Sequence, residues 1–149
     1  IATSTARNPV RGNLSYINDM RVKVSHTGLY TYPDVVIACG DIQFEDAATD
    51  TLLTPTVIVE VLSSSTEAYD RGEKFAHCRR LTSLQEYLLV AQDKVRIEHY
   101  VRQGDQWILS EISDLNNTLH LAAVDCTIAL QEVYDKVQFA ESDTPPPSR

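Results

Sequence analysis

The residue best suited to chemistry is a glutamate inside an apolar segment. Glu60 has aliphatic neighbours on both sides in the run VIVEVL at 57–62. A buried, unpaired carboxylate is destabilised by several kcal/mol, so Glu60 is expected to be paired, protonated or bound to a metal. Strand alternation places it on the same face as Ile58 and Leu62. A purely structural Arg or Lys partner is the alternative to a functional role.

A second acid, Asp34, follows Pro33 and opens the apolar segment Val35–Cys39. If the two segments are neighbouring strands, Asp34 and Glu60 converge at one end of a sheet. Two close carboxylates repel each other, and Mg²⁺ or Mn²⁺ relieves that repulsion, with the backbone carbonyl of Val61 as a further oxygen ligand. Taken alone, an acid at a strand entry is usually a solvated structural residue.

The third group is a lysine on the helix expected over Glu67–Arg80. Asp70 and Lys74 are i,i+4 neighbours, with His77 on the same side. An ammonium beside the acids positions an attacking water and stabilises the charge on an attacked phosphate. Residues 71–80 hold four basic residues against one acid, a cationic stretch in an acidic chain. The alternative is a solvated ion pair, which contributes only tenths of a kcal/mol.

Elements that would position these groups follow from periodicity and turn signals. Strands are predicted at 21–24, 35–39, 56–62 and 86–91, and a hairpin at 95–101 and 106–112 with its turn at 103–105. Helices are predicted at 67–80, where Gly72 is a weak point, and near the end, where Leu130, Val133, Tyr134 and Val137 form an apolar stripe. Residues 25–33 and 41–55 are predicted to be a loop and an irregular connection.

This order of elements predicts one α/β domain over residues 21–139. Residues 1–20 show no clear period and are left unassigned. Residues 140–149, which end in TPPPSR, are predicted to be a flexible tail.

Composition argues against two classes of protein, duplex binders that act through global charge and membrane-spanning proteins. The 149 residues carry a net charge of −8, which argues against sequence-independent duplex binding through global charge but leaves local phosphate contacts open. No apolar run reaches the roughly 18–20 residues of a membrane span, and no signal peptide is visible, so a soluble, cytoplasmic protein is expected, with no membrane partner.

Cysteine and histidine usage adds no second site. Cys39, Cys78 and Cys126 form no CxxC pair, so neither a disulfide framework nor a zinc site is indicated, and all three are expected to be partly buried. His99 lies on the apolar face of its strand and is expected to be a core or edge histidine with a satisfied ring.

Four separated blocks occur in the order of a known family: YPDVV at 32–36, VEVLSSST at 59–66, YDRGEKF at 69–75 and LQEYLLV at 84–90. In this order they resemble the Uma-type restriction-endonuclease family of the PD-(D/E)xK nuclease superfamily. The resemblance runs from about Arg21 to Phe139.

The resemblance implies a restriction-endonuclease-like core, a mixed β-sheet flanked by helices, and hydrolysis of phosphodiester bonds with Mg²⁺ or Mn²⁺. Asp34 matches the PD acid and Glu60 the second acid. Leu62 stands where the ExK motif has lysine, and Lys74 matches a lysine that has moved to the following helix. Asp70 matches a recurrent helix acid that binds metal, binds water or orients Lys74.

The same resemblance implies a nucleic-acid substrate, DNA in preference to RNA, and a homodimer. Related nucleases often take another acid from a preceding helix, and residues 1–20 hold no matching element. The alternative function is a catalytically inactive nuclease-fold module that binds protein or nucleic acid. A small-molecule phosphohydrolase is a more distant alternative.

Overall fold

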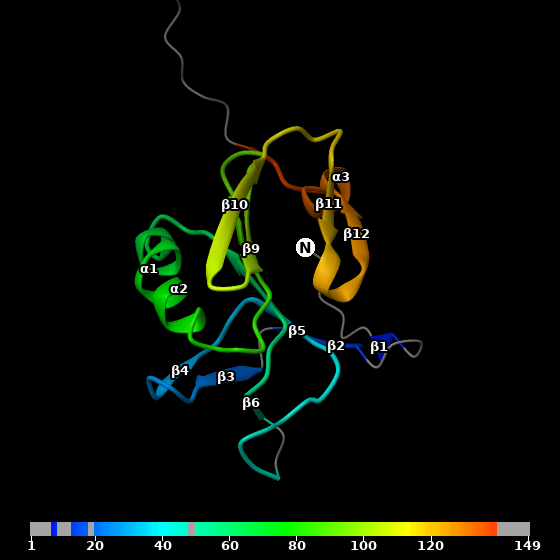
Figure 1. The fold of residues 1–149 in the computed structure, drawn as a ribbon. Helices are drawn as coiled ribbons and strands as arrows, with labels where there is room; N and C mark the ends of the chain where they lie inside the picture. Colours follow the sequence, from blue (N-terminus) through cyan, green and yellow to red (C-terminus); the bar gives the residue numbers. More distant parts are fainter. Residues whose placement is uncertain (1–6, 9–12, 18–19, 48–49, 140–149) are drawn as a thin grey trace, which may run out of the picture.

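The structure is a computed structural model that describes residues 7–8, 13–17, 20–47 and 50–139, with only the backbone described for 7–8 and 13–17. Its main element is a seven-stranded mixed sheet (Figure 1). In spatial order the strands are β1 (Arg7–Asn8), β2 (Asn13–Ile17), β5 (Val35–Ala38), β7 (Val57–Val61), β8 (Glu86–Val90), β9 (Ile97–Gln103) and β10 (Gln106–Ile112).

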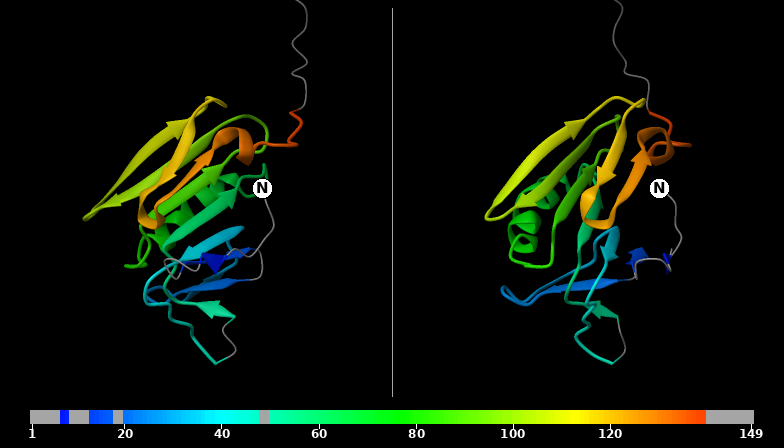
Figure 2. Two further views of the ribbon diagram at one scale, coloured as in Figure 1. Left: turned by 90° about the vertical axis from the view of Figure 1, so that its right-hand side faces the viewer. Right: turned by 45° about the vertical axis from the view of Figure 1, so that its right-hand side comes forward.

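The central pair β7 and β8 is parallel, whereas β5 runs antiparallel to β7 and β9 antiparallel to β8. The β7–β8 connection contains α1 (Glu67–Arg71) and α2 (Glu73–Cys78), which cover one face of the sheet (Figure 1). A two-stranded ribbon and two short helices cover the other face (Figure 2). These are β11 (Thr118–Leu121), η1 (Ala122–Val124), β12 (Cys126–Ala129) and α3 (Leu130–Val133).

A second, three-stranded sheet has the order β4-β3-β6 and lies beside one end of the main sheet (Figure 2). It contains β3 (Arg21–Val24), β4 (Leu29–Thr31) and β6 (Thr51–Leu52). β3 pairs antiparallel with β4 and parallel with β6.

The continuous β-branched run of β7 explains its central position. Ile58 packs in one apolar cluster with Phe75 and Tyr87, and Val57 packs in the other with Leu119. A strand buried on both faces needs apolar side chains at odd and even positions alike, as the sequence predicted.

The helix predicted over 67–80 is divided at Gly72, whose φ of −99° and ψ of −88° depart from helical values. Glycine lowers helix stability, and a Cβ there would lie 3.1 Å from the carbonyl oxygen of Ala68. The predicted C-terminal helix is also shorter than expected. It ends at Val133, and Lys136 adopts a left-handed φ of 65°, so Val137 does not extend the helix.

The strands β4, β6, β11 and β12 were not predicted. The loop expected at 25–33 contains β4, because Gly28, at a φ of 79°, lets the chain turn back on β3. The connection expected at 41–55 contains β6, and the ribbon β11–β12 had no counterpart in the prediction. In the unassigned N-terminal segment, β2 pairs with β5. The tail predicted at 140–149 lies outside the described residues.

Two smaller expectations can be compared directly. The cysteines are free thiols, but Cys126 is exposed, so the expectation of partial burial is wrong for that residue. The longest described helix, α2, has six residues, far fewer than the roughly 18–20 that cross a bilayer.

Candidate active site

The antiparallel pairing of β5 with β7 brings the two predicted acids together. Val35 lies opposite Val59, so Asp34 precedes one member of this pair and Glu60 follows the other. The Val61 N–H lies beyond the start of β5 and donates instead to Asp34 Oδ2 at 2.7 Å. The Asp34 side chain thus continues the ladder where the neighbouring strand has ended.

The same geometry places a backbone oxygen beside the acids. In an extended strand the N–H and C=O of one residue point to the same side. Because the Val61 N–H points to Asp34, the Val61 carbonyl is directed to that side as well.

Glu60 is 3% exposed, and its Oε1 lies 2.5 Å from Lys74 Nζ. This contact is an ion pair without the geometry of a directed hydrogen bond, so Oε1 is buried with no hydrogen-bond partner among the described residues. Burial raises the pKa of Glu60 to about 7. The Lys74 charge opposes this rise, while the nearby carboxylates of Asp70 and Asp34 add to it.

Asp70 is the third acid and is 5% exposed. Its Oδ1 lies 4.0 Å from Lys74 Nζ. Burial raises the pKa of Asp70, and the Lys74 charge and a hydrogen bond from Thr66 counteract this rise. The Tyr87 hydroxyl donates to the Asp70 carbonyl oxygen at 2.8 Å, which fixes α1 to strand β8.

Aromatic packing fixes the helix that carries Lys74. The neighbouring Phe75 ring lies 4.7 Å from Tyr87, 4.4 Å from Tyr100 and 5.4 Å from Trp107, measured between centroids. Aromatic pairs at these separations stabilise beyond their buried area. Lys74, itself 5% exposed, is therefore held in place by a rigid neighbour.

The acids and the lysine meet in a cavity of about 400 Å³. It is lined by Tyr32, Asp34, Glu60, Val61, Ser63, Thr66, Tyr69, Asp70, Lys74 and Gln92. When the side chains are ionised, three carboxylates face one ammonium, which leaves an excess of two negative charges. The predicted residues Asp34, Glu60, Val61, Asp70 and Lys74 all lie here.

The donor set fits a hard divalent cation. Asp34, Glu60 and the Val61 carbonyl offer oxygen only, and the buried Glu60 Oε1 lacks a directed hydrogen bond. In the described part of the chain, no three His, Cys, Asp or Glu side chains form a metal-binding group. Mg²⁺ is commonly held by one or two carboxylates, with water and substrate oxygens completing its shell, and these residues match that pattern.

Two residues of the predicted helix have partners outside the cavity. Arg71 is not a free cation, because it binds Glu67 at 2.8 Å and Glu98 at 2.7 Å. The cationic stretch at 71–80 is therefore partly neutralised. His77 contacts Thr27 and is not among the residues that line the cavity.

Sequence reasoning missed the aromatic and amide lining of the cavity. Tyr32 stands two residues before Asp34, and Tyr69 directly precedes Asp70. Both lie within two positions of a predicted acid in the sequence, and this proximity was the available signal that they border the site. Gln92, in the turn after β8, had no local signal at all.

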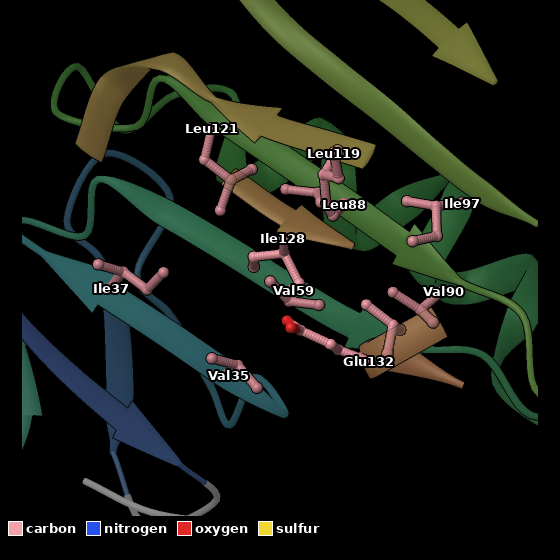
Figure 3. A pocket seen from close by; sticks show the side chains of 11 residues that line it. Val35, Ile37, Val59, Leu88, Val90, Ile97, Leu119, Leu121, Ile128 and Glu132 are labelled. Carbon is pink, nitrogen blue, oxygen red and sulfur yellow. The ribbon is translucent and has the colours of Figure 1, made fainter. Parts of the chain in front are cut away.

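A second cavity, of about 270 Å³, lies on the opposite face of the sheet (Figure 3). Ten aliphatic residues line it, among them Val59, Leu88 and Ile128, and Glu132 is the one charged residue among its described lining. Glu132 is thus its one ionisable group among the described lining, and this cavity has no cluster of acids and lysine like that of the candidate site.

A profile described as "Putative restriction endonuclease", that of the Uma2 family, matches residues 2–131. The chain belongs to the Uma2 family. The family resemblance expected from the four sequence blocks is confirmed.

Two similar proteins come from Synechocystis sp. (strain ATCC 27184 / PCC 6803 / Kazusa). The "uncharacterized protein sll1609" is 38% identical over 102 residues, which are 68% of this chain and 58% of the relative. The "uncharacterized protein slr1290" is 33% identical over 123 residues, which are 82% of this chain and 63% of the relative. The matches thus span about three fifths of these relatives' length.

The Uma2 chain also resembles a crystal structure from Anabaena variabilis ATCC 29413, described as "a putative nuclease belonging to DUF820". The TM-score is 0.68 at 17% identity, over 85% of this chain and 70% of the other. This likeness shows that the predicted mixed α/β, restriction-endonuclease-like fold is correct.

Proposed function

We propose that this Uma2 chain is a metal-dependent nuclease that hydrolyses phosphodiester bonds of nucleic acid. The observation that carries the proposal is the single cavity lined by Asp34, Glu60, Asp70 and Lys74, in which the ammonium of Lys74 lies close to Glu60 and Asp70. A site with an excess of carboxylates and one buried ammonium suits binding of a divalent ion next to a phosphate.

Asp34, Glu60 and the Val61 carbonyl are the proposed holders of Mg²⁺ or Mn²⁺. A cation bound there would supply positive charge that polarises the phosphate and makes water more acidic. The Val61 N–H holds one oxygen of Asp34 in a fixed position, so this ligand is preorganised. Glu60 must be ionised to bind, and its raised pKa of about 7 makes occupancy dependent on pH.

Lys74 is proposed to orient the attacking water and to stabilise the negative charge that accumulates on the phosphate. Its burial strengthens that electrostatic effect, because few water molecules screen it. Asp70, whose Oδ1 lies 4.0 Å from the ammonium, is proposed to help Glu60 hold it in position.

The Lys74–Glu60 ion pair is also the observation that favours a second candidate. A lysine that already neutralises the glutamate could be structural, and the chain would then be an inactive nuclease-fold module that binds protein or nucleic acid. This candidate requires that divalent cations do not compete with the ion pair.

Oligonucleotide cleavage tests the two candidates. The purified chain would be incubated with labelled single- and double-stranded DNA and RNA, with Mg²⁺, Mn²⁺ or EDTA. We expect metal-dependent cleavage that Asp34→Ala and Lys74→Ala remove, with cation binding largely kept in Lys74→Ala. Cleavage that survives Asp34→Ala would contradict the proposed site. No cleavage of any substrate would favour the inactive module.

The DNA preference, the homodimer and the cytoplasmic location stay predictions. The same panel compares DNA with RNA, and sedimentation of the purified chain measures its oligomeric state.

A further inference from the structure

Two exposed tyrosines line the cavity that contains the acids. Tyr32 is 60% exposed and belongs to the segment that leads into β5, whereas Tyr69 is 41% exposed and lies on α1. The two rings thus reach the cavity from two different elements. Each lies within two positions of an acid of the site.

These rings differ from the other tyrosines with described side chains. Those others make a ring contact or a hydroxyl hydrogen bond within the fold; they are Tyr30, Tyr87, Tyr100 and Tyr134. Within the described residues, no hydrogen bond, ring pair or cation–π contact involves Tyr32 or Tyr69. Their aromatic surface is therefore available to a ligand.

The chemistry beside them indicates which ligand would use that surface. A phosphodiester bound at the acids places a nucleotide on each side of its phosphate, and a nucleobase presents a flat π-face. Stacking of a base on an aromatic side chain is favourable and tolerates any sequence. Inside a duplex those faces are covered by neighbouring bases, so the rings reach them only where the strand is unpaired.

The charge of the chain favours the same substrate. Duplex binding depends on neutralising many phosphates with Lys and Arg, and this chain has a net charge of −8. The nearby Arg71 is already paired with two glutamates. Stacking provides affinity without further positive charge.

We propose that Tyr32 and Tyr69 stack on unpaired bases next to the phosphate held at the acids, so that the substrate is single-stranded or locally unpaired nucleic acid. This inference rests on the proposed function, because nucleic acid at the acids is what puts bases near the rings. It assigns the two tyrosines to substrate selection rather than to the chemical step.

Binding measurements separate stacking from other effects. Fluorescence anisotropy would compare a labelled single strand with the duplex of the same sequence, in Ca²⁺, and 2-aminopurine in the strand would report stacking by its quenching. Tyr32→Ala and Tyr69→Ala are each expected to weaken single-strand binding about 5- to 150-fold and to reduce quenching. The slope of affinity against salt should not change, because no phosphate contact is lost.

Matched variants keep the test decisive. Tyr32→Phe and Tyr69→Phe retain the ring and should bind like the original chain, while Tyr30→Ala removes a tyrosine of similar exposure, 43%, that does not line the cavity. Thermal melts identify any variant that fails to fold, and the Phe variants then decide the result. Equal affinity for single strand and duplex, or alanine variants that bind like Tyr30→Ala, would overturn the inference.

Failure of the stacking inference and failure of the proposed hydrolysis give different results. Loss of single-strand binding in the alanine variants, without cleavage by any form of the chain, would support base stacking on Tyr32 and Tyr69 (the tyrosine platform) and contradict hydrolysis. Metal-dependent cleavage that ignores both tyrosines would support hydrolysis and contradict the platform.

Discussion

Two buried glutamates on neighbouring strands have opposite surroundings. Glu86, at the start of β8, is 1% exposed, and both of its oxygens are bonded, Oε1 to His99 Nε2 at 2.7 Å and Oε2 to the Ala123 N–H at 3.0 Å. Glu60, near the end of β7, has an oxygen without a directed hydrogen bond and faces a cavity with two further acids.

The difference distinguishes a structural carboxylate from a ligand-binding one. Glu86 connects β8 to the neighbouring strand β9 and to η1 through fixed partners, and a buried carboxylate with all its partners in place needs no ligand. Glu60 is buried beside Asp34 and Asp70, whose like charges oppose its ionisation. An additional cation would relieve that repulsion.

The largest expected effect is on catalysis. Glu60→Gln should reduce cleavage by about 10³-fold, because it removes a proposed metal ligand while preserving shape. Glu86→Gln should change cleavage by less than about threefold per folded molecule, since Glu86 does not line the cavity. Initial rates, normalised to the folded fraction from circular dichroism, measure both. Equal losses of cleavage rate in the two variants would contradict the distinction between a ligand-binding Glu60 and a structural Glu86.

The second-largest effect is on the free energy of unfolding, and it is expected for Glu86. Glu86→Ala should lower the free energy of unfolding by about 3–5 kcal/mol, because it leaves His99 and the Ala123 N–H buried without their partner. Urea denaturation measures the change, and a double-mutant cycle with His99→Ala isolates the pair. A loss below about 1 kcal/mol would show that the pair is not structural.

The raised pKa of Glu60 predicts how stability depends on pH in the metal-free chain. A carboxyl that titrates near 7 when folded and near 4.5 when unfolded binds more protons in the folded state between those values. Stability should therefore fall as pH rises from 4.5 to 7, by at most about 3 kcal/mol from this group.

Glu60→Gln should flatten that pH dependence, leaving the smaller part that arises from Asp70, whose pKa is also raised. Urea denaturation at pH 5, 6, 7 and 8 measures the slopes. An unchanged slope in Glu60→Gln would mean that Glu60 is ionised throughout this range.

The smallest effect is expected at an exposed acid. Glu45 binds Lys23 at 2.9 Å and accepts a hydrogen bond from Tyr30 at 2.6 Å on the surface. Exposed ion pairs contribute little, so Glu45→Gln should leave both the melting temperature and cleavage unchanged. This variant provides the baseline against which the effects of the Glu60 and Glu86 variants are compared. A clear drop in the melting temperature would show that exposure is a poor guide to the role of a carboxylate here.

Much of the site was predictable because its signals are local. The burial of Glu60 follows from its aliphatic neighbours, and Lys74 lies one helical turn after Asp70. The convergence of Asp34 with Glu60 required one assumption, that their strands are adjacent, and the pairing of β5 with β7 satisfies it.

Features that depend on contacts distant in sequence were not predictable. The ring of His99 was expected to be satisfied, but its partner Glu86 is 13 residues away, and nothing local named it. The division of the helix at Gly72 was indicated only as a weak point, because glycine alone does not determine whether a helix ends. The ribbon β11–β12 lacks a strong local pattern and is stabilised by packing on the sheet.

Binding of Mn²⁺ tests the central claim most directly. Isothermal titration at pH 8, where Glu60 is mostly ionised, would compare the original chain with Asp34→Ala, Glu60→Gln and Glu86→Gln. We predict specific binding by the original chain and by Glu86→Gln, and its loss in the other two variants. Binding that persists in Asp34→Ala and Glu60→Gln, or that is absent from the original chain, would contradict the assignment of the metal site to these two acids.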